Sequence, residues 1–273
     1  MARSPSAEYL ILDIETVPDT ERWHPDPPPA PPAEGAPPEP PRVDRPKFPP
    51  SWAHRIITIG CAWLDHGYRL KKVGVIGDPG PSRTSPGPAS PSADHRERIL
   101  LEDFSALVGK ARPVLVTYNG RSFDLPVIAL RSLCHGVSLG WYYREKNVRY
   151  RYSEEGHLDL CDWLADHGAT RSGSLDALAR LIGLPGKVGI DGSQVEPLYL
   201  AGRLDEIQRY CVADVAQTAL LFLRFRLLQG MLAPDAYQAA TAALLDALAA
   251  DGRVTEVLAG IDRAHLIGTS PAP

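Results

Sequence analysis

The chain has 273 residues, of which 44% are apolar, and a formal net charge of −4 at neutral pH. This length suits one medium-sized domain, with or without appendages. The slightly acidic balance excludes a protein that coats nucleic acid through an overall basic field, although a local basic groove remains compatible with it.

The cysteine pattern and the hydropathy favour a soluble cytoplasmic protein. Cys61, Cys134, Cys161 and Cys211 form no C-x-x-C pair and have no histidines at zinc spacing. We therefore expect four small buried thiols rather than disulfides or structural zinc. The first residues include no hydrophobic signal region, and no apolar run reaches the roughly 18–20 residues of a membrane span. These features predict a cytoplasmic location and no membrane partner.

Strands and helices alternate along most of the chain. Strands are predicted at 9–17, 55–64, 68–77 and 113–120, and the stretch 157–168 begins with a fifth, short strand and continues as a helix. Further helices are predicted at 96–111, 122–134, 172–186, 204–230 and 234–252. Ser122 is the expected N-cap of the helix at 122–134, and Pro126 lies in its first turn. Three early strands followed by alternating helices and strands predict an α/β domain with a mixed five-stranded sheet flanked by helices.

Two proline-rich segments, 24–50 and 78–94, interrupt this pattern. Their composition buries little and cannot hold a helix or a central strand, so we interpret them as extended surface insertions, the second a flexible loop. The predicted organisation is one functional domain over 1–230, followed by a C-terminal helix and tail over 231–273. A protein-interaction scaffold built on the first insertion is an alternative.

Carboxylates occur where a buried strand or an apolar helix face is expected. Asp13 and Glu15 lie two apart in the strand "YLILDIETVP" and so share one of its faces. Taken alone, such a pair is more often a half-exposed strand edge. Asp124 lies in the first turn of its helix, where an acid is ordinarily a capping residue. Asp214 lies beside the apolar face of the helix at 204–230, one turn after Tyr210.

A cluster of these acids needs a compensating charge. Four neighbouring carboxylates repel and raise one another's pKa, and divalent cations with hard oxygen ligands, Mg²⁺ or Mn²⁺, remove that cost. Two such ions are the standard arrangement for attack on a phosphodiester.

The motifs that contain these residues have a family resemblance. "DIET", "YNGRSFDLP" and "YCVAD" closely resemble, in order and spacing, the three signature motifs of the DEDD 3′–5′ exonucleases, over roughly residues 9–230. The resemblance is nearest to the predicted exonucleases related to the proofreading domain of family B DNA polymerases. Because Tyr210 lies four residues before Asp214, the chain is similar to the tyrosine branch of that superfamily.

The resemblance implies a ribonuclease H-like fold and a metal-dependent 3′–5′ exonuclease. It implies two Mg²⁺ or Mn²⁺ ions held by the four carboxylates, with Tyr210 orienting the water. The implied partner is a single-stranded DNA or RNA with a 3′ end, and the implied product is a nucleoside 5′-monophosphate. A catalytically silent nucleic-acid-binding module of the same fold is the competing hypothesis.

Four further residues are candidates for substrate binding. Asn119 either contacts the terminal nucleotide or only forms its Asn-Gly turn, and Phe123 either packs on the terminal nucleotide or belongs to the core. Arg149, in the basic and aromatic stretch "WYYREKNVRYRY", belongs either to a strand-binding surface or to a solvated hairpin. Lys187 either meets a phosphate or is a loop charge. His157 and Asp159 are interpreted as a local structural pair.

Overall fold

The computed structural model describes residues 7–24, 48–77 and 92–268. Most of the two predicted proline-rich insertions, 24–50 and 78–94, lies outside these residues, so the expectations for them stay predictions. Within the described ranges, no helix is both long enough and apolar enough to span a membrane.

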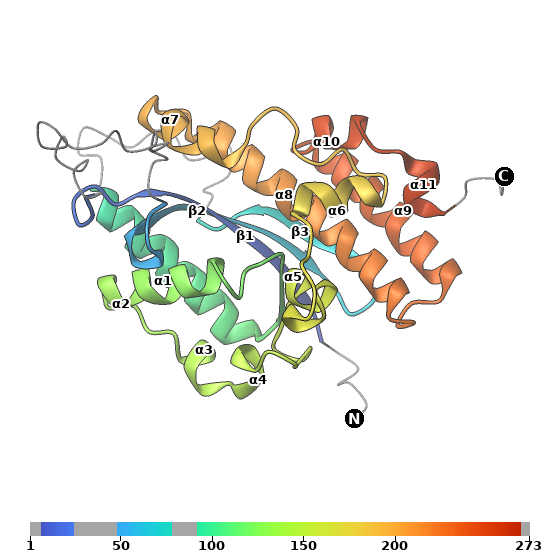
Figure 1. Cartoon of the computed structure of the whole chain (residues 1–273), viewed down its shortest axis with the longest axis horizontal. Helices are drawn as coiled ribbons and strands as arrows, with labels where there is room; N and C mark the ends of the chain where they lie inside the picture. Colours follow the sequence, from blue (N-terminus) through green and yellow to red (C-terminus); the bar gives the residue numbers. More distant parts are fainter. Residues whose placement is uncertain (1–6, 25–47, 78–91, 269–273) are drawn as a thin grey trace, which may run out of the picture.

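Strands and helices alternate in the order that the sequence indicates (Figure 1). The strands are β1 (Tyr9–Pro18), β2 (His54–Leu64), β3 (Leu70–Val75), β4 (Val114–Thr117) and β5 (His157–Asp159). The helices are α1 (Ala93–Ala111), α2 (Asp124–His135), α3 (Gly140–Arg144), α4 (Lys146–Arg149), α5 (Leu160–Leu164), α6 (Leu175–Leu181), α7 (Val195–Leu200), α8 (Leu204–Leu228), α9 (Pro234–Asp251), α10 (Thr255–Ala259) and α11 (Arg263–Ile267), with short 3₁₀ turns at Ser51–Ala53, Asp166–Gly168 and Gly192–Gln194.

The strands form one mixed sheet in the order β3-β2-β1-β4-β5. β2 runs antiparallel to both β1 and β3, whereas β4 runs parallel to both β1 and β5. The central strand β1 pairs with β2 over its whole length but with β4 only from Tyr9 to Ile11. The second half of β1 therefore has no β4 partner along one edge. The predicted mixed five-stranded sheet is confirmed.

Helices cover both faces of this sheet, with α8 and α9 on one side and α1 and α2 on the other (Figure 1). Successive strand residues point to opposite faces, and β1 follows this rule. Tyr9 and Ile11 belong to the core on the α8 side, and Leu10, Leu12 and Ile14 to the core on the α1–α2 side. Asp13 and Glu15 continue the row of Tyr9 and Ile11, so they are aimed at α8.

Gly60 lets α8 approach the sheet closely beside Asp13. Gly60 is the β2 partner of Asp13 in the strand register. A Cβ atom at this position would lie 2.7 Å from Sγ of Cys211 and 3.1 Å from Cγ2 of Val215, both on α8. Only a residue without a side chain fits that gap, so glycine here sets the distance between the helix and the strand.

A buried ionic network joins the end of β1 to both helices on the opposite face. Arg131 of α2, only 1% exposed, donates to Glu97 of α1 through Nε (2.7 Å) and Nη2 (2.6 Å), and to Asp19 through Nη1 (2.7 Å). Arg55 of β2 also donates to Asp19, at 3.0 Å. Glu97 accepts further bonds from the backbone N–H of Ile56 and from the ring of His135. The network therefore connects two strands and two helices.

Two local expectations and one of the alternatives left open are wrong. Phe123, not Ser122, occupies the N-cap position of α2, and no side chain caps that helix. The stretch 141–152 is not a hairpin, since it contains most of α3 and all of α4. The four cysteines are all free, but of these only Cys211 is buried, and Cys134 is exposed on α2.

The C-terminal segment shares the core of the rest of the chain. Tyr237, Leu244 and Leu248 of α9 are buried in the same apolar cluster as Tyr9 and Phe222. After α9 the chain forms two short helices, α10 and α11, which the sequence did not predict. The domain division at residue 230 stays a prediction.

Candidate active site

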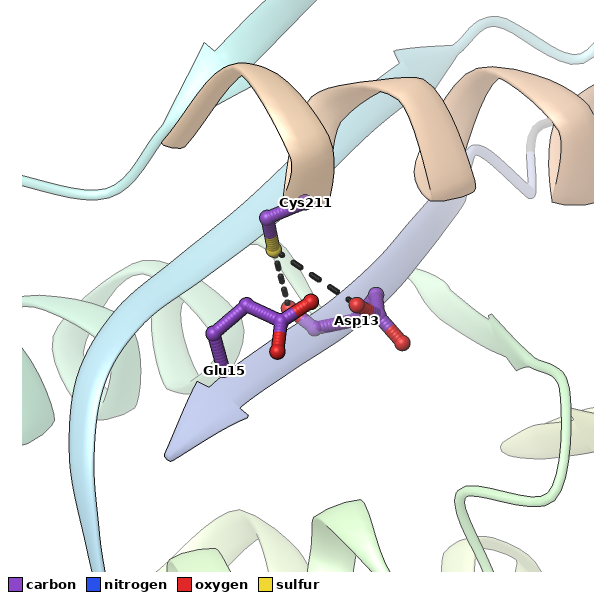
Figure 2. Close-up of side chains that lie close together, drawn as sticks. All are labelled: Asp13, Glu15 and Cys211. Atoms are coloured by element: carbon purple, nitrogen blue, oxygen red, sulfur yellow. Dashed lines mark hydrogen bonds between the residues drawn. The ribbon is translucent and has the colours of Figure 1, made fainter. Parts of the chain in front are cut away.

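Asp13 and Glu15 lie side by side on the α8-facing side of β1. Figure 2 shows Asp13 and Glu15 on this strand and Cys211 reaching toward them from α8. Single ligand atoms of the three side chains lie within 4.8 Å of one another. The thiol of Cys211 is 3.5 Å from the backbone oxygen of Asp13 and 3.6 Å from its carboxylate. Glu15 is buried and Asp13 partly so.

Asp124 joins this pair from the edge of β1 that β4 leaves unpaired. Its Oδ1 accepts a hydrogen bond from the backbone N–H of Ile14, at 3.1 Å. Ile14 lies between Asp13 and Glu15 in the strand, so the bond holds the Asp124 carboxylate beside both. The first residue of α2 can reach β1 because β4 ends at Thr117, and the connection turns through Asn119, which has a positive φ of 65°.

Tyr210 and Asp214 extend the cluster from α8. They lie one helical turn apart, and the Tyr210 hydroxyl acts to lower the pKa of the Asp214 carboxyl. The charge of Asp214 acts on both Asp13 and Glu15. The structure therefore brings together all five residues that the sequence predicted as catalytic.

Burial and mutual repulsion make these carboxyls weak acids. Burial, followed by repulsion from its neighbours, raises the pKa of Asp13 well above its usual range, and the same two causes act on Glu15. Burial also raises the pKa of Asp124 to about 7 and that of Asp214 to about 6. For Asp214, the Tyr210 hydroxyl and the charge of Lys187 partly oppose this rise.

The donor set fits divalent metal ions with oxygen ligands. Four carboxylates crowd one site, and the positive charge that acts on Glu15 and Asp214 there is that of Lys187. The cost of ionising such a cluster in a buried position is removed by Mg²⁺ or Mn²⁺, which favour carboxylate oxygens. Asp13 and Glu15 place ligand atoms close enough to hold such an ion, and Asp124 and Asp214 act on both through their charges.

The predicted substrate-binding residues separate into two groups. Phe123 lies on the wall of a cavity that also includes Glu15, and Lys187 is close enough to act on the carboxylates. Arg149 instead lies over the rings of Tyr142 and Tyr143, at 5.8 and 5.1 Å from their centroids. Asn119 is exposed, and its backbone N–H donates to Asp159.

His157 and Asp159 have structural roles, although they bond to other residues rather than to each other. The His157 ring is hydrogen-bonded to Thr117, at 2.8 Å. Asp159 accepts from the backbone N–H groups of Asn119, Arg121 and Cys161. Asp159 thus fixes the turn that leads from β4 to Asp124.

Sequence reasoning missed Cys211 and the aromatic cavity beside Glu15. Cys211 has a sequence signal, since it lies three residues before Asp214 on one face of α8. The cavity lining includes Trp23, Phe48 and His54. These residues come from a turn after β1, from a loop and from β2, and no local pattern relates them.

The repulsion leads to a prediction for Asp214→Asn. The pKa of Asp214 is raised from 3.8 to about 6, so the folded protein loses stability as the pH rises through this interval. Without metal at pH 8, the substitution is expected to raise the free energy of unfolding by about 1–2 kcal/mol. With millimolar Mn²⁺ the gain should shrink or reverse, because the wild type binds the ion more tightly. Urea unfolding with EDTA or with Mn²⁺ measures this.

The matched control is Asp205→Asn, on the exposed side of α8, where the pair with Arg209 is solvated. It should have little effect under either condition. If Asp214→Asn changes the free energy of unfolding equally with and without Mn²⁺, Asp214 is not part of the metal site.

The chain is similar to several known proteins. A family described as "predicted 3′–5′ exonuclease related to the exonuclease domain of PolB" matches residues 46–260. The catalytic subunit of DNA polymerase epsilon from Schizosaccharomyces pombe is 27% identical over 134 residues, which are 46% of this chain and 6% of that protein. The corresponding protein of Emericella nidulans is 24% identical over 196 residues, which are 66% of this chain and 9% of the relative.

A solved structure shares the architecture. The family B DNA polymerase of the archaeon Pyrobaculum calidifontis matches with a TM-score of 0.50 and 18% identity, over 88% of this chain and 26% of the polymerase. The match shows the fold, and the expected ribonuclease H-like α/β architecture is confirmed. The chain spans less than a tenth of the length of the two epsilon polymerases.

Proposed function

The chain belongs to the family of predicted 3′–5′ exonucleases related to the exonuclease domain of PolB, and from this premise we propose that it is a metal-dependent 3′–5′ exonuclease of the tyrosine branch. The observation that carries the proposal is the convergence of Asp13, Glu15, Asp124 and Asp214 from β1, α2 and α8, with Tyr210 one helical turn before Asp214. The substrate is a nucleic acid strand with a free 3′ end, and the product is a nucleoside 5′-monophosphate.

The acids have separate roles toward the metal ions. Asp13, Glu15 and Asp214 would hold one Mg²⁺ or Mn²⁺, and Asp13 and Asp124 would serve a second. When bound, two such ions lower the pKa of a water molecule and stabilise negative charge on the departing 3′ oxygen. The backbone N–H of Ile14 fixes one oxygen of Asp124, which leaves its other oxygen available.

Tyr210 orients the attacking water and does not act as its base. Burial and the neighbouring acids raise the pKa of the Tyr210 hydroxyl above its usual value of 10, so at neutral pH it stays protonated. A protonated phenol donates one hydrogen bond and accepts others. The charge of Lys187 acts on Asp214, which supports a role for Lys187 in meeting a phosphate of the strand.

A catalytically silent binding module of the same fold is not favoured, because the chain retains all four carboxylates and the tyrosine. The cytoplasmic location stays a prediction, as do the roles of Asn119 and Arg149 in strand binding.

The proposal is tested with labelled strands. We expect 3′-labelled single-stranded DNA or RNA to release labelled mononucleotide at once in Mn²⁺, and the 5′-labelled strand to shorten stepwise. Circular single-stranded DNA should survive, since it has no end, and EDTA should stop all release. Cleavage of the circle, or binding of strands without release in either metal, would overturn the proposal.

A further inference from the structure

Three tyrosine rings are exposed on the surface that α3, α4 and the turn after them form. Tyr143, Tyr150 and Tyr152 are 60%, 58% and 56% exposed. Trp141 and Val148 of the same stretch are buried, so they attach the two short helices to the core and leave the tyrosines outside. Exposed rings that gather in one place are a common sign of a binding surface.

Positive charges without carboxylate partners lie among these rings. In the part of the chain that the structure describes, Arg144, Lys146 and Arg149 form no ion pair, and all three are exposed. The acid between them, Glu145, is paired with Arg112 at 3.4 Å. Three cations therefore remain next to the rings, although the chain as a whole is slightly acidic. We call the following group the tyrosine surface: Tyr143, Arg144, Lys146, Arg149, Tyr150 and Tyr152.

The rings and the charges share one hollow. A cavity of about 460 Å³ is lined in part by Tyr143 and Tyr150 and by Lys146 and Arg149. The guanidinium of Arg149 lies over the ring of Tyr143, a contact that does not neutralise its charge. The ring of Tyr152 extends the surface beyond the hollow, with its centroid 5.7 Å from that of Tyr150. A ligand here would meet flat apolar faces and cations at the same time.

This combination selects single-stranded nucleic acid as the ligand. Stacking on aromatic rings holds unpaired bases with little regard to sequence, and cations beside the rings meet the phosphates along the strand. In a duplex the neighbouring pairs cover the faces of the bases, so the rings would have no base to stack on. A strand also carries a phosphate at every nucleotide, which matches several separate cations.

The tyrosine surface adjoins the turn that leads to Asp124 but is separate from the acid cluster. Nη1 of Arg121, in that turn, donates to the backbone oxygen of Arg149 at 3.1 Å. The backbone N–H of Arg121 donates to Asp159 at 2.7 Å, which fixes the turn. None of the described residues that line the cavity beside Glu15 belongs to the tyrosine surface. This surface is therefore a second place, next to the first, at which a strand could be held.

We propose that the tyrosine surface binds single-stranded nucleic acid on the 5′ side of the nucleotide that is removed. The proposal rests on the exonuclease function above and adds a second contact with the same substrate. Two linked contacts hold a strand more tightly than either alone, because the second forms within the complex. Strands long enough to reach both places should therefore bind more tightly than strands that reach only the acids.

The first test removes one ring. Tyr150→Ala should weaken binding of a long single-stranded oligonucleotide about 5- to 100-fold, the loss expected for one base–aromatic stack, and Tyr150→Trp should restore it. A blunt duplex of the same sequence should bind the wild type and Tyr150→Ala equally. Binding is followed by fluorescence anisotropy in EDTA, so that no strand is cut. Leu200→Ala, which truncates an exposed apolar side chain on α7, is the control and should bind as the wild type does.

The part of the strand that meets the tyrosines is identified on the ligand. A strand whose upstream half is abasic should bind the wild type as weakly as the intact strand binds Tyr150→Ala, with no further loss in the combination. A strand that lacks only its 3′-terminal base should still show the full loss with Tyr150→Ala. Unchanged binding of the intact strand by Tyr150→Ala, an equal loss on the duplex, or coupling to the terminal base alone would overturn the proposal.

The second test removes one charge. Lys146→Gln should make the slope of log affinity against log salt shallower by about 0.7, the value for one phosphate contact of a single strand. Lys72→Gln is the matched control, since Lys72 is exposed on β3 at the other edge of the sheet, and it should leave the slope unchanged. An unchanged slope for Lys146→Gln would show that this cation meets no phosphate and would contradict the proposal.

These measurements separate the proposal from the proposed function. Unchanged binding by Tyr150→Ala in a protein that still releases mononucleotides would refute only the tyrosine surface. A protein that shows the coupled binding losses but releases nothing in Mn²⁺ would refute only the exonuclease.

Discussion

Asp13→Asn is expected to lower the rate of mononucleotide release by about 10³-fold or more, while leaving the protein folded. Asp13 is the acid whose charge is coupled to Asp124, Glu15 and Asp214 together. Asparagine has nearly the same shape but no charge, so the variant loses the carboxylate that the two proposed metal ions share. The measurement is the single-turnover rate on a 3′-labelled strand in Mn²⁺.

Stability provides the internal check. Without metal, Asp13→Asn should be at least as stable as the wild type, because it removes repulsion from a buried cluster. Asp103→Asn, at an exposed position on α1, is the control and should leave the rate unchanged. A rate within about tenfold of the wild type would exclude Asp13 from the central role proposed for it.

Arg131→Ala is expected to lower the free energy of unfolding by about 3–5 kcal/mol, the cost of breaking a buried ion pair from one side. Arg131 is the shared partner of Asp19 and Glu97, which are 0% and 2% exposed. Its removal leaves both carboxylates buried with fewer donors. Urea unfolding at neutral pH measures the loss.

The matched control is Arg98→Ala on α1, whose pair with Glu102 is exposed on both sides and should contribute less than about 1 kcal/mol. Arg131→Met distinguishes charge from packing, since it fills part of the same volume and should still destabilise the protein. Equal losses for Arg98→Ala and Arg131→Ala would show that the network adds nothing to stability.

Acid should weaken this network in the wild type. Burial alone would raise the pKa of Asp19, but hydrogen bonds from Arg131, Arg55 and Arg22 outweigh it and hold that pKa below its usual value. A carboxyl with a lowered folded-state pKa stabilises the fold above its unfolded-state pKa of about 4, and this stabilisation is lost as the pH falls through the folded-state value.

Long regular elements could be predicted from the sequence because their signals are local. The apolar strand around Asp13 and the apolar helix around Asp214 repeat their patterns over many residues, and both lie within a residue or two of their predicted bounds. The prediction of Ser122 as the N-cap is wrong because Asp159 accepts hydrogen bonds from the backbone of the preceding turn. These bonds set the path of the chain into the helix. The stretch 141–152 has charges and aromatics in alternation, but residues such as Trp141 and Val148 are buried by tertiary packing.

The site could be predicted only in part, because only some of its residues have a local sequence signal. Asp13, Glu15, Asp124, Tyr210 and Asp214 are found through motifs. Contacts between distant segments have no such signal: Arg131 and Asp19 are 112 residues apart. The aromatic cavity beside Glu15 similarly depends on how β1, β2 and the start of α2 meet, which no single segment encodes.

The unequal exposure of the cysteines has a practical consequence for spectroscopy. Cys134 is exposed near the end of α2, whereas burial raises the pKa values of the other three thiols, that of Cys61 to about 11. Because thiolates are the reactive species, a maleimide dye should label the natural chain selectively at Cys134. The label would sit on the same helix as Asp124, so its fluorescence would report on that helix as a strand or a metal ion binds, with no cysteine having to be introduced or removed.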